Sequence, residues 1–417
     1  MTDILDDLQW RGLIQDSTGL DELRKHLAGG PVTFYVGFDP TAPSIHHGNL
    51  VQVLTARRLQ LAGHRPLLLV GGATGLIGDP KDSGERVLND PAVVATWVDK
   101  IRRQVEPFFD FEGSVAATMV NNLDWTQPMS AIEFLRDVGK HFPVNKMLAR
   151  DVVRNRLESG ISYTEFSYQL IQGNDFFELH RRYGCSLQFG GSDQWGNITA
   201  GVDYVRRRGA GPVHAFTTPL VTKADGTKFG KTEGGALWLD PSMTSPYAFY
   251  QFWFNTDDRD VVPFMKIFSL RGREEIEELA RETAEKPFLR GAQKALAEEL
   301  TTLLHGKQEC QAVIAASQAL FGRGALSDLP ESTLGAALAE AGLARVSSLD
   351  NAAVLFRESG LASSLGDARR AAAEGGMYLN NERVSDPDSP LSRDSLLHGR
   401  YLVLRRGKKT IAGVELV

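Results

Sequence analysis

The sequence predicts an α/β protein built on a Rossmann-like, doubly wound parallel sheet. From residue 31 to residue 120, short apolar runs alternate with segments of helical spacing. Strands separated by helices form parallel sheets, because a parallel connection needs a long crossover. The chain has 417 residues, which is enough for two or three domains at about 150 residues each.

Three apolar runs predict the first strands of this sheet. They are Val32 to Phe38, Pro66 to Val70, and Val115 to Val120. Between them, Gly48 to Leu61 and residues 91–111 carry apolar side chains at helical spacing. We therefore expect strands and helices to alternate from the first strand to the third.

The rest of the chain divides by composition. Residues 128–208 predict mostly helix, with one short strand near Leu187 to Phe189, and residues 246–319 predict acid-rich helices. Residues 321–350 mix Gly, Ser, Asp and Pro with weak apolar periodicity, which predicts a linker that contains a small amount of structure. We expect a Rossmann-like catalytic domain (1–222), a mobile lysine loop with an α-helical domain (223–320), the linker (321–350) and a C-terminal domain (351–417).

Charge and cysteine content narrow the class of protein. The 46 Lys and Arg against 52 Asp and Glu give a net charge of −6, which argues against a polycationic nucleic-acid binder. Residues 351–417 nevertheless hold ten Lys and Arg against eight Asp and Glu, which hints at a nucleic-acid role there, although the charges alone favour a solvated domain face. The two cysteines, Cys185 and Cys310, cannot supply a disulfide scaffold or a zinc site of four cysteines.

The N-terminal residues also bear on location. They are acidic where a signal peptide needs bases, and no stretch of about 18 apolar residues occurs. We expect a soluble, cytoplasmic protein with no membrane partner.

Residues 37–49 follow the first strand and open a helix. A helix N-terminus at the carboxyl end of a parallel sheet offers free N–H groups to a phosphate. His46 could donate to a phosphate oxygen there, and Gly48 would let a nucleotide approach the backbone. A structural turn with two surface histidines, His46 and His47, explains this stretch equally well.

Residues 223–232 form the second candidate element. Gly226 and Gly230 predict a mobile loop that carries three lysines. Lysines on a closing loop suit a polyphosphate whose charge moves during reaction. Taken alone, an exposed basic loop is the simpler interpretation.

The two elements together resemble the paired signatures of class I aminoacyl-tRNA synthetases. The first is His-His-Gly-Asn at residues 46–49 and the second is Lys-Phe-Gly-Lys-Thr at residues 228–232. Residues 35–42, 71–80 and 190–198 are, in addition, similar to bacterial tyrosyl-tRNA synthetases. The resemblance covers essentially the whole chain and implies a tyrosine–tRNA ligase activity. Tyrosine and ATP would give tyrosyl-adenylate and pyrophosphate, and tyrosine would then pass to the 3′-terminal adenosine of its tRNA.

One helix is expected to carry much of the tyrosine pocket. Tyr168, Gln172 and Asp175 fall at i, i+4 and i+7 and share a face, and the spacing alone favours a polar stripe bonded to neighbouring core elements. The resemblance implies that Asp175 and Tyr35 bond the substrate phenol. By the same resemblance, Asp79, Tyr168 and Gln172 hold its ammonium group, and Gln194 lies near its carboxylate.

The resemblance also implies the ATP site. Charge at the phosphates would be stabilised by four residues, Thr41, His46, Lys228 and Lys231, while Asp39 places the adenosine. The remaining nucleotide contacts implied are Gly37, Gly48, Gly191, Asp193 and Thr232. No protein base is needed, because the attacking carboxylate is already ionised at neutral pH. Mg²⁺ would accompany ATP, held by phosphates and water, without a metal site in the protein.

Two parts of the ATP site depart from the family pattern. Asn49 stands where the signature has a second His that contacts the ribose, so we expect retained activity with altered ATP binding. The loop after Asp79 is slightly shortened, and it carries Lys81 and Arg86 as expected pyrophosphate contacts.

The C-terminal residues resemble the small RNA-binding domain named after ribosomal small-subunit protein S-four. The basic residues expected to contact tRNA phosphates are Arg369, Arg370, Arg405, Arg406, Lys408 and Lys409. The resemblance also implies a homodimer, with tRNA crossing between the subunits.

Three alternatives remain at this point. A tryptophan-specific ligase shares the fold, but Tyr35 with Asp175 and the C-terminal module argue against it. A nucleotidyltransferase acting on a small metabolite would not need residues 351–417. A non-enzymatic RNA-binding paralogue is suggested by Asn49, although Lys228, Lys231 and the pocket residues are intact.

Overall fold

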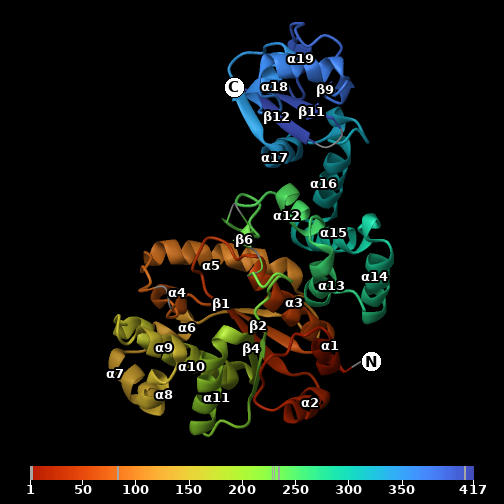
Figure 1. Cartoon of the computed structure of the whole chain (residues 1–417). Coiled ribbons are helices and arrows are strands. Elements are labelled where there is room, and N and C mark those ends of the chain that lie inside the picture. The colour runs from red at the N-terminus through yellow and green to blue at the C-terminus, as the bar shows by residue number, and fades with distance from the viewer. Residues whose placement is uncertain (1–2, 82–83, 228, 230, 233–234, 408–409) are drawn as a thin grey trace. The chain divides into compact units, whose positions relative to one another are not determined.

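The computed structural model describes residues 3–81, 84–227, 229, 231–232, 235–407 and 410–417 (Figure 1). The chain forms two compact units. The first comprises Met1–Asp240 with Asp257–Ala292, and the second comprises Pro241–Thr256 with Gln293–Val417. The helices predicted over residues 246–319 are therefore shared between the units. The fourfold domain division stays a prediction.

A five-stranded parallel sheet lies at the centre of the first unit, in the order β3-β2-β1-β4-β5 (Figure 1). Its strands are β1 (Thr33–Phe38), β2 (Arg65–Val70), β3 (Thr118–Asn121), β4 (Cys185–Gly191) and β5 (His214–Thr218). β1 and β2 pair in register from Thr33 opposite Arg65 to Phe38 opposite Val70. The predicted Rossmann-like, doubly wound sheet is confirmed.

Helices cover both faces of the sheet. Its central strands are therefore buried on both sides, which explains why they are continuous apolar runs. Figure 1 shows α3 and α5 on one face and α10 and α11 on the other. The helices of this unit are α1 (Ile4–Trp10), α2 (Leu20–Ala28), α3 (His47–Leu61), α4 (Thr74–Ile77), α5 (Pro91–Val105), α6 (Leu123–Thr126), α7 (Ala131–Glu133), α8 (Val144–Leu148), α9 (Asp151–Arg156), α10 (Tyr163–Tyr183), α11 (Trp195–Arg207), α13 (Asp258–Phe268) and α14 (Arg273–Glu285). Shorter pieces are the helical turns η1 (Glu106–Phe108), η2 (Phe134–Val138), η3 (Gly139–His141), η4 (Ser192–Gln194) and η5 (Pro287–Leu289), and a two-stranded ribbon of β6 (Lys231–Thr232) and β7 (Gly235–Ala236).

The third strand begins later than its apolar run predicts. Val115 was expected to start it, but β3 begins at Thr118. The backbone before it is engaged elsewhere, because the Val115 carbonyl accepts from the Gln60 side chain at 3.0 Å and the Ala117 N–H donates to Asp110 at 2.8 Å. β5 was not predicted at all, since His-Ala-Phe-Thr-Thr is short and half polar.

The second unit contains a mixed sheet of order β10-β9-β11-β12-β8. Its strands are β8 (Leu343–Val346), β9 (Met377–Leu379), β10 (Glu382–Arg383), β11 (Tyr401–Arg406) and β12 (Thr410–Leu416). Its helical elements are α12 (Pro246–Phe254), α16 (Lys307–Ala319), α17 (Glu331–Ala341), α18 (Ala352–Glu358), α19 (Leu365–Ala373), η6 (Leu326–Asp328) and η7 (Arg393–Ser395), and α15 (Gly291–His305) runs into this unit from the first.

The expected linker of residues 321–350 is wrong as a description of structure. It contains η6 and α17, and β8 pairs in parallel with β12. α17 buries Thr333, Leu334, Ala337 and Leu338, and these mostly small side chains give a weak apolar signal. The segment is therefore part of the C-terminal fold. Among the described residues, no helix has the length and apolar character that a membrane crossing requires.

Candidate active site

The predicted site residues of the first unit gather at the carboxyl edge of the parallel sheet. β1 lies between β2, which follows it in sequence, and β4, which does not, so the chain changes direction across the sheet between β1 and β4. Open α/β sheets bind ligands at such a switch point. Tyr35 and Gly37 lie in β1 with Asp39 directly after it, and Gly191, Asp193 and Gln194 end β4 and form η4.

Asp175 is buried at the inner end of this site. It lies on α10, and its two carboxylate oxygens accept from Asn122 Nδ2 at 2.9 Å and from Trp125 Nε1 at 2.8 Å. Burial raises the pKa of Asp175 to about 7, although both donors favour the charged form. The carboxylate is thus fixed in orientation and changes charge near neutral pH.

The Tyr35 hydroxyl is one of the buried polar groups that lack a hydrogen-bond partner in the described part of the chain. Its side chain is 2% exposed and packs on Phe176 with ring centroids 5.4 Å apart. No described residue forms a hydrogen bond with Tyr35 Oη, and the same holds for Gln172 Oε1 on α10. Burial and the nearby Asp175 charge raise the pKa of Tyr35 well above its usual value, so the hydroxyl keeps its proton. Buried polar atoms at a sheet switch point that lack a partner among the described residues are candidates to bond a ligand.

A chain of hydrogen bonds joins Asp39 to Asp175. Tyr168 Oη and Thr74 Oγ1 donate to the two oxygens of Asp39, the second at 2.7 Å. Thr74 Oγ1 accepts in turn from Asn122 Nδ2 at 3.1 Å. Asp39 therefore shares a network with Tyr168, which the resemblance assigns to the ammonium group, and its own pKa is raised by burial.

Glycine is required where this network passes the backbone. A Cβ on Gly71 would lie 2.1 Å from Thr74 Oγ1 and 2.3 Å from Asp39 Oδ1. Any larger residue would displace both side chains.

Asp79 follows α4 and faces the turn after β4. Gln194 Nε2 donates to one of its oxygens at 3.0 Å and Asn197 Nδ2 to the other at 3.1 Å. The structure therefore brings together Asp79 and Gln194, which the sequence placed 115 residues apart.

The start of α3 is built around His46. Its Nδ1 accepts from the Gly48 N–H at 3.0 Å, which leaves the ring proton on Nε2, where no acceptor occurs among the described residues. A Cβ on Gly48 would lie 2.8 Å from the His46 ring. Protein surrounds most of this ring although one edge stays exposed, and that burial, with His47 beside it, lowers the pKa of His46 to about 4. His46 is therefore a neutral donor at the helix N-terminus.

Asn49 has a structural role in the same turn. Its Oδ1 accepts from the His46 backbone N–H at 3.1 Å and completes a capping box. Thr41 is exposed just after Asp39, whose carbonyl accepts from the Thr41 N–H at 2.9 Å.

The lysine loop is described only in part. Lys228 lies outside the described residues, and of Lys231 and Thr232 the structure describes the backbone in β6. Phe229 packs against Phe264 and His47, with ring centroids 4.6 Å and 4.8 Å apart, and the Ala224 N–H donates to buried Asp260 at 2.6 Å. The loop is thus attached to the first unit through an aromatic side chain and a backbone hydrogen bond.

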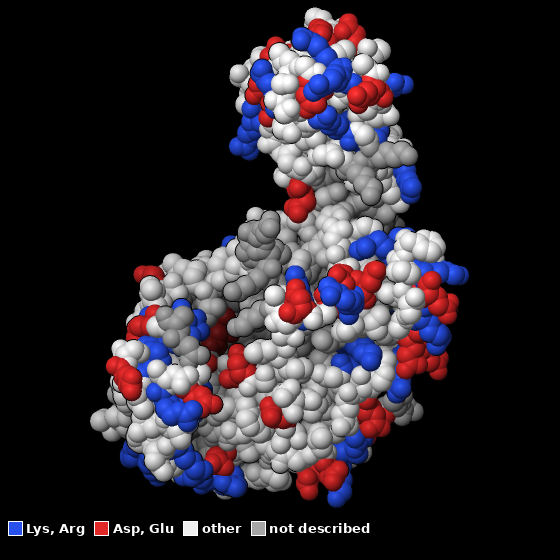
Figure 2. Space-filling view, viewed as in Figure 1, with Lys and Arg blue, Asp and Glu red and all other residues white. Residues whose placement is uncertain are grey.

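The predicted RNA-binding residues lie on α19 and β11. Arg406 makes two 2.9 Å bonds to Asp367, Arg405 stacks 4.0 Å from the Tyr378 ring centre, and Arg369 pairs with Asp388 at 2.9 Å. Arg370 is the most open of these, with a side chain 76% exposed. Acidic and basic side chains are intermixed over this region in Figure 2. Lys408 and Lys409 lie outside the described residues.

Sequence reasoning missed Asn122, Trp125, Thr74 and Asn197. Each donates a hydrogen bond to a carboxylate of the site, and Asn122 also donates to Thr74. A signal existed for Asn122, because an Asn-Asn pair directly after a predicted strand places polar groups at the carboxyl edge. Trp125 carried no such signal, since its pattern is that of a core residue.

Comparisons with known proteins match the same stretches. A family model described as tRNA synthetases class I (W and Y) matches residues 27–322, and one described as Tyrosine--tRNA ligase SYY-like C-terminal domain matches residues 345–413. Proteins of Streptomyces coelicolor and Streptomyces griseus, both named Tyrosine--tRNA ligase, are each 64% identical to this chain over 419 residues, covering 100% of it and 99% of the relative. The crystal structure of a C-terminally truncated Aspergillus nidulans mitochondrial tyrosyl-tRNA synthetase aligns with a TM-score of 0.70 at 32% identity, covering 77% of this chain and 95% of that one.

Proposed function

Because this chain belongs to the tyrosine–tRNA ligase family of class I aminoacyl-tRNA synthetases, it joins tyrosine to tRNA, and we propose that it selects tyrosine through Tyr35 and Asp175. The observation that carries this assignment concerns two neighbouring groups. The buried Tyr35 hydroxyl has no hydrogen-bond partner among the described residues, and the nearby Asp175 carboxylate accepts from two donors. A substrate phenol donates to Asp175 and accepts from Tyr35. Phenylalanine would leave both groups unpaired, which is costly in a dry pocket.

The outer part of the pocket binds the amino-acid backbone. Asp79, Tyr168 and Gln172 hold the substrate ammonium, and Gln194 lies near its carboxylate. The Asp79 carboxylate, oriented by Gln194 and Asn197, supports this assignment, as does the Gln172 oxygen that lacks a partner among the described residues. Asp39 joins them through its bond to Tyr168 and also places the adenosine.

Activation is an in-line displacement at the α-phosphate of ATP. A carboxylate oxygen of tyrosine bonds to the α-phosphorus while the bond to the bridging oxygen of pyrophosphate breaks. The developing charge is met by the neutral Nε2–H of His46, by Thr41 and by the cations Lys81, Arg86, Lys228 and Lys231, with Thr232 beside them. Gly37, Gly48, Gly191 and Asp193 border the nucleotide, and Asn49 acts mainly by capping α3, which positions His46.

Mg²⁺ enters as part of the MgATP substrate. Phosphate oxygens and water would hold this ion. The described residues include no group of three His, Cys, Asp or Glu placed to hold a metal ion. The protein contributes cations and backbone donors around that complex.

Transfer to tRNA completes the reaction. A hydroxyl of the 3′-terminal ribose attacks the activated carbonyl carbon, and AMP leaves. The C-terminal residues, of the ribosomal S-four type, contribute phosphate contacts through Arg370 and its neighbours. Since Arg406 and Arg405 are tied to Asp367 and Tyr378, they support that surface more than they bind RNA.

The protein acts as a cytoplasmic homodimer. Large apolar side chains are exposed along α7 to α10, among them Ile132, Leu135, Val144 and Tyr163. Figure 1 shows α7, α8 and α9 close together at one end of the first unit. An exposed apolar patch of this kind fits a subunit interface.

The test is amino-acid-dependent exchange of pyrophosphate into ATP, with tyrosine, phenylalanine and tryptophan in separate assays. Exchange with tyrosine alone is expected. Exchange with tryptophan would overturn the pocket assignment, and absence of exchange with all three would overturn the activation chemistry. Charging of tRNA by the full chain and by a variant with Arg370→Ala then tests the RNA surface.

A further inference from the structure

A buried ion pair lies beside the active site, outside the residues assigned so far. Arg156 ends α9 and its side chain is 5% exposed, while Glu165 lies in the first turn of α10 and is 1% exposed. Arg156 Nη1 and Glu165 Oε2 are 3.2 Å apart. Replacing such a pair by apolar residues is often neutral or stabilising, so stability alone does not explain its presence.

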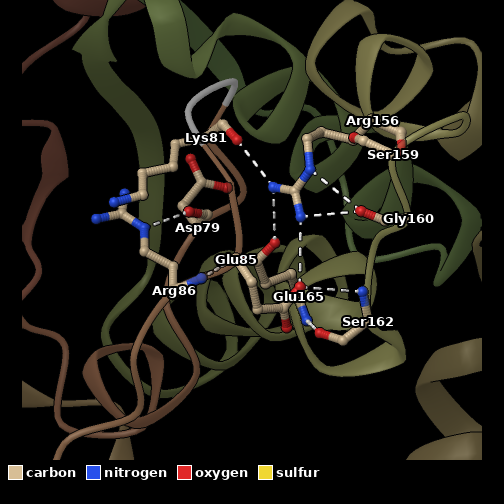
Figure 3. Close-up of polar contacts among 9 residues, drawn as sticks. All are labelled: Asp79, Lys81, Glu85, Arg86, Arg156, Ser159, Gly160, Ser162 and Glu165. Carbon is tan, nitrogen blue, oxygen red and sulfur yellow. Dashed lines mark hydrogen bonds and ion pairs between the residues drawn. The ribbon is translucent and has the colours of Figure 1, made fainter.

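Both members of the pair hold the backbone of the loop that follows Asp79 (Figure 3). Arg156 Nη1 donates to the Lys81 carbonyl at 2.9 Å, and Glu165 Oε1 accepts from the Arg86 N–H at 2.5 Å. The two ends of a short stretch of chain, residues 81 and 86, are thus fixed by opposite charges. Arg156 Nη2 also approaches Glu85 at 3.3 Å, and its Nε donates to the Gly160 carbonyl at 3.2 Å.

The Lys81 and Arg86 side chains are not bonded to the Arg156–Glu165 pair and remain available to contact a ligand. Lys81 is exposed and makes no ion pair with a described residue, and Arg86 donates through Nε to the Asp79 carbonyl at 2.9 Å. The pair therefore engages the main chain at both ends and leaves two cationic side chains directed by that main chain.

Glu165 also connects the loop to the tyrosine pocket. Glu165, Tyr168 and Gln172 lie at i, i+3 and i+7 of α10, so they follow one another along a single face of the helix. Asp175 continues the same row. One rigid helix thus sets the loop at its first turn and the amino-acid pocket over the next turns.

We propose that Arg156 and Glu165 are positioning residues that align the Lys81 and Arg86 side chains with the pyrophosphate end of ATP, relative to tyrosine held on α10. This inference rests on the proposed function. Binding of tyrosine itself does not need the pair, because other donors hold Asp175 and Asp79, and Tyr35 packs on Phe176.

The principal test replaces both charges with apolar side chains of similar length, Arg156→Met with Glu165→Leu. We expect the double variant to fold and to bind tyrosine within about twofold of the parent, since no buried charge is left unpaired and Glu85, which also loses Arg156, has a side chain 51% exposed to water. Pyrophosphate exchange should fall on the order of 10²-fold, because displacement of positioning groups by about 1 Å costs that much. The loss should appear in kcat and in the KM for ATP and pyrophosphate, with the KM for tyrosine nearly constant.

Two further variants keep the inference testable if the double variant does not fold. Glu165→Gln keeps an acceptor for the Arg86 N–H and should keep more exchange activity than the double variant. Arg154→Met is the matched control, because Arg154 lies on the same helix in an exposed pair with Asp151 and does not touch the loop. It should leave exchange unchanged.

Two results would overturn the inference. One is exchange within twofold of the parent in the folded double variant. The other is a rise in the KM for tyrosine as large as that for ATP, which would make the pair a general support of α10. If the parent protein itself shows no tyrosine-dependent exchange, the proposed function fails, which separates that outcome from failure of the positioning role.

Discussion

The two ends of the candidate active site are built differently. At the tyrosine end, the carboxylates of Asp175 and Asp39 are each held by two side-chain donors from fixed helices and strand ends. At the proposed phosphate end, the cations lie on two loops that the structure describes only in part. The loop of residues 81–86 is held by the Arg156–Glu165 pair, and the lysine loop by Phe229 in an aromatic cluster.

This difference follows from the task of each end. Rejection of a wrong amino acid requires that polar groups cannot rearrange to satisfy themselves. Charge on ATP moves as pyrophosphate departs, and groups on loops can follow it. Side-chain hydrogen bonds to carboxylates therefore dominate at the tyrosine end, whereas the described part of the lysine loop is attached through the aromatic contacts of Phe229 and one backbone hydrogen bond from Ala224 to Asp260.

The comparison predicts its largest effect at Asp175. Asp175→Ala should lower kcat/KM for tyrosine by more than about a hundredfold, roughly 3 kcal/mol, because Asn122, Trp125 and the substrate phenol all lose a charged acceptor. The KM for ATP should change little. Steady-state pyrophosphate exchange at varied tyrosine measures both. A loss shared equally with ATP would show that the two ends are not independent.

A second effect concerns pH. Since the pKa of Asp175 is raised to about 7, the acceptor form falls from mostly populated at pH 8 to a minor form at pH 6. Tyrosine affinity should therefore drop by about tenfold over that range, as one titrating group requires. His46, with a pKa lowered to about 4, stays neutral throughout and adds no such dependence. Equilibrium titration with tyrosine at several pH values tests this, and a flat profile would contradict it.

A smaller effect is expected from Tyr35→Phe. Removal of the hydroxyl should weaken tyrosine binding by about fivefold, the value of one hydrogen bond near 1 kcal/mol. It should leave the free energy of unfolding of the empty protein unchanged or slightly higher, because the deleted group has no partner among the described residues. Binding assays and denaturant unfolding are the two measurements. Destabilisation above 1 kcal/mol would mean that the hydroxyl supports the fold.

The smallest effect is predicted at Phe229. Phe229→Leu retains an apolar anchor among His47, Phe264 and Phe268, so the KM for ATP should change by less than about threefold, as for other hydrophobic substitutions that conserve most of the volume. Phe229→Ala, which removes the anchor, serves as the contrast and should change it more. Equal behaviour of both variants would show that the ring itself, and not its volume, attaches the loop.

Local pattern was sufficient to predict most of the sheet and the polar face of α10, although it missed β5. Apolar runs locate β1, β2 and β4, and the spacing of Tyr168, Gln172 and Asp175 needs only the geometry of a helix. The donors Asn122 and Trp125 lie about 50 residues from Asp175 in sequence, and pairs so distant leave no periodic signal. α17 was missed because its buried face is mostly small side chains, and the Arg156–Glu165 pair because charged residues in sequence suggest a solvated surface.

Under the proposed contact between Tyr35 and the substrate phenol, the stability of the folded chain depends on the supply of tyrosine, because the Tyr35 hydroxyl lacks another partner among the described residues. A ligand that satisfies a buried hydroxyl binds the folded chain and not the unfolded one, so it raises stability by mass action. At a free tyrosine concentration one hundred times the dissociation constant, that gain is about 2.7 kcal/mol. When tyrosine is scarce, the protein without bound ligand would therefore unfold more often, and the unfolded chain would be cleaved by proteases. The abundance of the enzyme would then follow the supply of its own amino acid without any dedicated regulator.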